Sequence, residues 1–112
     1  MSPIVYGILS PAGLVMKKGE PVEIKNAIGM TFGVHCNDRR TADDELRFVV
    51  TNIETGMLAG NGTTRDAAIE RARMRVRSAI KRGTLARTFE ESMRTRAAIL
   101  VELGDVRAEG AA

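Results

Sequence analysis

The stretch Thr63–Arg82, TTRDAAIERARMRVRSAIKR, decides the fold that we predict for this chain. Its apolar residues recur at intervals of three and four, which is typical of an amphipathic α-helix with one face toward a core. Those residues are Ala68, Ile69, Ala72, Val76, Ala79 and Ile80. The ends agree with this prediction, because Thr63 can cap the first turn and Gly83 can adopt the left-handed conformation that terminates a helix.

The predicted helix is more basic than the chain around it. Residues 65–82 carry seven basic side chains and two acidic ones, a balance of +5, whereas the whole chain carries +3. At about 100° per residue, the cations fall into two rows beside the apolar face. One row holds Arg73, Arg77 and Lys81 together with Asp66 and Glu70, and the other holds Arg71, Arg75 and Arg82 with no acid on the same helix.

We call Arg71, Arg75 and Arg82 the arginine row, and three interpretations of it are open. In the first, the row is a solvated face whose aliphatic stems shield the edge of the core. In the second, it binds phosphates or a carboxylate-rich protein, because the planar guanidinium suits both. In the third, acids elsewhere in the fold, such as the run Asp43–Glu45, neutralise it.

The length and composition indicate one soluble domain. A chain of 112 residues is long enough to bury its own core. The single cysteine, Cys36, excludes an intramolecular disulfide and fits a reducing compartment. The N-terminal segment lacks the basic leader of a secretion signal, and no stretch approaches the ~20 apolar residues of a membrane span. We therefore expect a cytoplasmic protein without a membrane segment.

Short β-rich segments separated by turn residues precede the helix. They are Ile4–Ser10, Leu14–Met16, Val22–Lys25, Thr31–His35, Leu46–Ile53 and Met57–Ala59, with turn residues at Lys17–Pro21 and a charged loop at Cys36–Glu45. After Gly83, Thr88–Glu91 matches a capping box for a second helix that ends at Gly104, unless Thr84 already opens it. Its predicted inner face is Phe89, Met93, Ala97, Leu100 and Leu103.

These segments predict a single α+β domain over residues 1–104. An antiparallel sheet of four or five strands comes first, and two C-terminal α-helices follow and pack on one face of it. Residues 105–112 are small or charged and are predicted to form a disordered tail.

No motif in the chain assembles a catalytic or metal centre. His35 and Cys36 are adjacent on a predicted strand, so their side chains point to opposite faces, and two ligands are too few for a structural zinc site. The acidic run Asp43–Glu45 lacks EF-hand spacing. Gly60-Asn61-Gly62 precedes the helix, but no lysine of a phosphate loop follows and Arg65 stands where a dinucleotide motif has its third glycine. We therefore expect no enzymatic activity, no cofactor and no metal.

Residues 48–76 resemble the β-hairpin and final helix of double-stranded RNA-binding domains. That family reads G-x-G-x-S-K-K-x-A-K-x-x-A here, and this chain matches it at Gly60, Gly62, Thr64, Arg65, Ala68 and Ala72, with Asp66 and Ile69 in place of two lysines. The same unit is similar to the N-terminal part of HicB-type antitoxins, which bind a toxin protein. The resemblance implies close packing of the helix on the hairpin, and only faintly a function.

The leading functional prediction is a small non-enzymatic module that binds nucleic acid by holding phosphates with the arginine row. Arg65, Arg39 and Arg40 are predicted to assist. The alternative is a protein-binding module, such as an antitoxin or an inhibitor, that presents the arginine row to an acidic partner surface. We also expect a homodimer through the edge of the Leu46–Ala59 hairpin.

Overall fold

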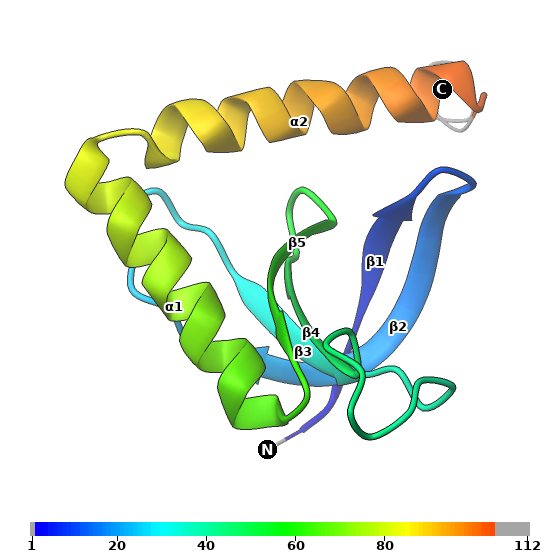
Figure 1. The fold of residues 1–112 in the computed structure, drawn as a ribbon. Coiled ribbons are helices and arrows are strands. Elements are labelled where there is room, and N and C mark those ends of the chain that lie inside the picture. Colours follow the sequence, from blue (N-terminus) through cyan, green and yellow to red (C-terminus); the bar gives the residue numbers. More distant parts are fainter. Residues whose placement is uncertain (1, 105–112) are drawn as a thin grey trace.

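The computed structural model describes residues 2–104, which form a five-stranded antiparallel sheet followed by two α-helices (Figure 1). This is the α+β fold that the sequence predicts. The elements are β1 (Ile4–Ser10), β2 (Gly13–Val22), β3 (Phe32–Cys36), β4 (Phe48–Asn52), β5 (Met57–Gly62), α1 (Arg65–Arg82) and α2 (Leu85–Glu102). The predicted tail over 105–112 lies outside the described residues. Neither helix is long and apolar enough to cross a membrane.

The five strands pair in the order in which they occur in the chain. The predicted turn at Lys17–Pro21 is wrong, because β2 runs through it and changes partner there. Its first seven residues pair with β1 and its last three with β3. Gly19 lies at this exchange, and a Cβ on it would stand 2.3 Å from the carbonyl oxygen of Val34. The glycine therefore permits a close crossing of strands where we expected a turn, and the predicted strand Val22–Lys25 ends at its first residue.

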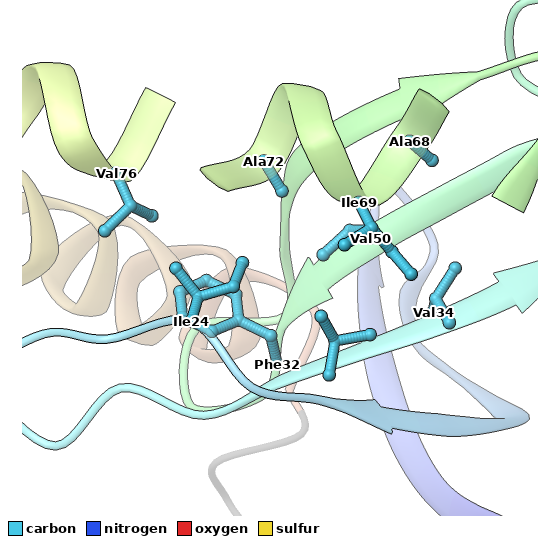
Figure 2. Packing of buried hydrophobic residues seen from close by; sticks show 9 residues of the cluster. Ile24, Phe32, Val34, Val50, Ala68, Ile69, Ala72 and Val76 are labelled. Carbon is cyan, nitrogen blue, oxygen red and sulfur yellow. The ribbon is translucent and has the colours of Figure 1, made fainter. Parts of the chain in front are cut away.

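The main core lies between α1 and one face of the sheet (Figure 2). It contains Val22, Ile24, Phe32, Val34, Val50, Ala68, Ile69, Ala72 and Val76. The helix approaches β5 closely, since a Cβ on Gly60 would stand 2.6 Å from the backbone nitrogen of Ala72 and 2.7 Å from the carbonyl oxygen of Ala68. Small residues on both elements therefore set the distance between helix and sheet.

A second, smaller buried layer lies on the other face of the sheet. There Tyr6 covers Gly33, where a Cβ would stand 2.5 Å from the Tyr6 ring. His35 and Thr51 are buried on the same face, and the Thr51 hydroxyl has no hydrogen-bond partner among the described residues. The backbone N–H of Leu9 donates to the carbonyl of Gly56 at 2.8 Å, so the β1–β2 ribbon curls back over the β4–β5 turn.

The predicted helix ends are nearly correct for α1. Thr64, not Thr63, is the N-cap, because its hydroxyl accepts the N–H of Ala67 at 3.1 Å. Gly83 ends the helix in the left-handed conformation, with φ of 71°, as expected. The buried face of α1 is shorter than predicted, since Ile80 is 48% exposed.

The helix α2 starts where the alternative at Thr84 predicts, and it departs from the capping box at Thr88 and from its predicted inner face. It begins at Leu85, because the N–H of Thr88 already donates to the carbonyl of Thr84 and is not free for a capping box. Leu85 packs against the core and Phe89 is half-buried. Beyond them, Met93 and Leu103 are largely exposed and Leu100 is buried. Figure 1 shows the helix crossing the end of the sheet where the β4–β5 turn lies.

Replacing Gly60 with alanine is predicted to lower the free energy of unfolding by about 3 kcal/mol, because the new methyl group would collide with the backbone of α1 and force it off β5. The matched change Gly7→Ala meets only the flexible end of Leu14, at 3.3 Å, and is predicted to cost under about 1 kcal/mol. Urea denaturation of both variants checks this. Equal losses would show that the closeness of α1 to β5 is not what Gly60 provides.

Candidate nucleic-acid interface

The arginine row runs along an exposed side of α1, between the buried stripe and the opposite row of cations. Arg71 and Arg75 are one turn apart and Arg82 lies two turns further, so the row extends about 16 Å along the helix axis. Within residues 2–104, no carboxylate forms a salt bridge with Arg75 or Arg82. These two guanidinium groups are therefore available to an anion from outside.

Arg71 differs from its neighbours, because Glu45 in the β3–β4 loop binds it. Its guanidinium donates to the Glu45 carboxylate at 2.8 Å and to the carbonyl of Asn61 at 3.2 Å. The Asn61 amide also donates to the Glu45 carbonyl at 2.8 Å, which holds the loop beside β5. The expectation that acids elsewhere neutralise the row is therefore fulfilled at one of its three positions. The two side chains are 53% and 60% exposed, so the pair contributes at most about 1 kcal/mol.

The acidic run Asp43–Glu45 is divided among three different partners. Asp43 accepts a hydrogen bond from the hydroxyl of Thr41 at 2.7 Å. Asp44 pairs with Arg40 at 3.3 Å, and the N–H of Leu46 donates to it at 2.7 Å. The hydrogen bond from Leu46, and next the cation of Arg40, hold the pKa of Asp44 below its usual value. Of these three acids, only Glu45 contacts α1. The other two stabilise the β3–β4 loop itself and leave the helix uncovered.

The three assisting arginines lie in different surroundings. Arg40 is held by Asp44, whereas Arg39 is exposed and has no salt bridge in the described part of the chain. Arg65 is half-buried at the start of α1 and pairs with Glu20 of β2 at 3.4 Å and with Asp66 at 3.9 Å. The structure thus groups Arg71, Arg75 and Arg82 on one helix side, and it uses Arg65 and Arg40 mainly to tie loops and strands together.

The opposite row of cations is more heavily engaged. Arg77 pairs with Glu70 at 3.5 Å. Arg73 instead donates to the carbonyl of Glu23 at 3.3 Å, across an open cleft of about 620 Å³. Lys25 and Glu23 line the same cleft, so both signs of charge meet there. This mixed surface is a poorer anion site than the arginine row.

His35 is fixed by hydrogen bonds and is only 5% exposed. Its Nδ1 lies 3.5 Å from the hydroxyl of Tyr6, and its Nε2 lies 3.1 Å from the amide oxygen of Asn37. Burial lowers the pKa of His35 and the charge of Lys17 lowers it further, against the hydrogen bond to Asn37. Burial also raises the pKa of Tyr6 to about 12. Cys36, the next residue, is a half-buried free thiol.

Sequence reasoning left two features of this region unresolved, namely which acid of the Asp43–Glu45 run meets the arginine row and the presence of a pocket beside that row. The pairing of Glu45 with Arg71 joins residues 26 positions apart, and only the closeness in the fold of the β3–β4 loop to β5 brings them together. Arg75 also lines a small cavity under α2, which no sequence pattern indicated. Within residues 2–104, no three His, Cys, Asp or Glu side chains gather closely enough to hold a metal ion.

Comparison of the chain with protein-family models, with curated proteins and with solved structures found no match in any of the three. The resemblance to double-stranded RNA-binding domains and to HicB-type antitoxins stays a prediction that rests on the residues quoted for it.

The buried His35 is predicted to make stability depend on pH. Its pKa is lower in the folded chain than the usual 6.5, so the unfolded chain binds more protons between the two values. The contribution of His35 to the free energy of unfolding is therefore fully present above pH 6.5. It is lost as the pH falls toward the pKa of His35 in the folded chain. Urea denaturation between about pH 5.5 and 7.5 checks this. His35→Gln, which cannot titrate, is expected to flatten the profile, and an unchanged profile would contradict the assignment.

Proposed function

We propose that this protein is a non-enzymatic nucleic-acid-binding module that holds the phosphate backbone with the arginine row of α1. The observation that carries the proposal is that Arg75 and Arg82 are exposed on one helix side and have no carboxylate partner within the described residues. Unpaired guanidinium groups on a rigid helix suit phosphate oxygens, which they bind through two parallel hydrogen bonds.

Arg71 can join this site at small cost. Its pair with Glu45 is exposed on both sides and is worth at most about 1 kcal/mol, so a phosphate that arrives beside Arg75 can compete with the carboxylate. The N–H groups at the start of α1 lie at the other end of the helix, where Thr64 already accepts one of them. The proposal therefore places the contact on the side of the helix, and the helix terminus has no part in it.

Replacing Arg71, Arg75 and Arg82 together with glutamine is predicted to weaken binding of a labelled RNA or DNA duplex and to flatten its salt dependence. Each lost phosphate contact lowers the slope of log affinity against log salt by about 0.9, so the triple variant is expected to lose about two to three units of slope. Filter binding or fluorescence anisotropy between about 50 and 200 mM salt measures the slope.

The matched control replaces Arg73, Arg77 and Lys81 with glutamine. It removes the same charge from the same helix but from the side that already meets Glu70 and Glu23. We expect this control to keep most of the slope. Equal losses in the two triple variants would mean that net charge alone drives binding, and no binding by the wild-type protein at low salt would refute the proposal.

Replacing Glu45 with glutamine is predicted to tighten duplex binding about two- to fivefold, because it frees Arg71 and removes a negative charge next to the phosphate path. The same change at Glu91 of α2 removes an equal charge that has no salt bridge in the described part of the chain, and it is expected to give a smaller gain. An equal gain at both positions would contradict a specific contact at Arg71.

One observation favours the alternative, a protein-binding module. Met74 is 58% exposed and lies between the two rows of cations on α1. Exposed methionine beside arginine is common in protein interfaces, where it fills pockets that a phosphate backbone does not offer. A stoichiometric protein partner whose binding is lost in Met74→Glu, while duplex binding is absent, would establish this alternative.

The expected homodimer remains a prediction of its own. The strand β5 is an edge strand, as pairing with a second copy requires. One of its carbonyl groups, that of Asn61, already accepts a hydrogen bond from Arg71. A second copy would therefore have to pair along the rest of this short edge, and sedimentation at high concentration reports whether it does.

A further inference from the structure

We propose that the partly open pocket between α2, α1 and the sheet binds a small carboxylate with a single aromatic or branched aliphatic body, and that Arg75 pairs with its carboxylate. This inference does not rest on the proposed function, because it concerns the cavity itself and is tested without nucleic acid.

The cavity has the lining of a small-molecule site. Its walls are largely apolar, with Phe32 of β3, Met57 and Leu58 of β5, Val76 of α1, and Leu85 and Phe89 of α2. Asn52 of β4 and Thr55 add polar groups. A mostly apolar pocket with a few convergent polar groups is the usual form of such sites. The segment of α2 that closes it is the part that lies nearest to the core, beginning with Leu85.

The size of the cavity limits what fits. Its volume is about 150 Å³, about the size of an engineered apolar cavity known to take up benzene. One six-membered ring or a branched chain of similar bulk therefore fills it. A nucleotide or a long acyl chain would leave most of its surface outside the pocket, because each is larger than this space.

The charge of the lining selects an anion. Arg75 is the one charged side chain in the cavity wall, and within residues 2–104 it has no salt bridge. A carboxylate matches the planar guanidinium with two hydrogen bonds. Thr88 and Ser92, one turn apart on α2, line the same cavity, and neither hydroxyl has a side-chain hydrogen bond in the described part of the chain. They supply further donors for a ligand oxygen.

The shape of the ligand follows from these positions. The apolar body occupies the space beneath α2, and the acid group remains where Arg75 lies on the exposed side of α1. An uncharged molecule of the same body would fill the cavity but leave the guanidinium without a partner. A small acid without an apolar body would meet only a solvated arginine, where the gain is small.

The test is titration of the full chain with benzoate, followed by amide chemical shifts in NMR spectra. Benzoate is expected to shift the amides of β5 and of the first half of α2 in a saturable way. Benzyl alcohol is expected to bind about tenfold more weakly, because it lacks the charge-assisted hydrogen bonds. Acetate is expected to give no saturable shift of these amides.

Three variants complete the test. Arg75→Gln, on the exposed side of α1, is expected to weaken benzoate binding about tenfold, whereas Arg73→Gln on the opposite side of the same helix leaves it unchanged. Ser92→Phe fills the cavity and is expected to abolish binding. Absence of saturable shifts with benzoate, equal shifts with acetate, or equal losses in Arg75→Gln and Arg73→Gln would each overturn the proposal, whether or not Ser92→Phe folds.

Discussion

The structure depends on the close approach of one helix backbone to one strand. Gly60 on β5 lies against the backbone of Ala68 and Ala72, and no side chain separates the two elements there. This contact orients α1 about its own axis, so that the buried stripe faces the sheet. The direction of the charged rows is a consequence, because each row is placed by its angle from the stripe. The arginine row therefore owes its position to residues that carry no charge.

Some surface charges form salt bridges that connect parts of the fold, and others have no such partner among the described residues. Three carboxylates pair with arginines in this way. Glu20 and Glu45 connect segments that are distant in sequence, and Asp44 connects residues within an irregular loop. Such exposed pairs add little free energy individually. Their larger effect is on the field around α1, because every carboxylate near a guanidinium reduces the attraction for other anions. Within residues 2–104, no carboxylate pairs with Arg75 or Arg82.

Local patterns were sufficient to predict the α+β architecture and most of α1. The run of β-forming residues in Phe48–Asn52, the glycines of β5 and the apolar spacing from Ala68 to Val76 each depend on residues close in sequence. The change of partner in β2 could not be predicted, because a glycine and a proline such as Gly19 and Pro21 are expected both in a turn and at a crossing of strands. The inner face of α2 was misjudged because its apolar residues are periodic, while only part of the helix meets the core. For the candidate site, the sequence identified the arginines but could not identify their partners, which come from distant segments.

The order of the strands bears on how fast the chain can fold. Each strand pairs with the one that follows it in the chain, so each pairing closes only the loop between neighbouring strands. The bond between Leu9 and Gly56 is one of the few that join remote segments within the sheet. A meander of this kind has a low contact order for a β-rich domain, and search time grows with contact order. Such a topology favours pairing between neighbouring segments over contacts between remote ones.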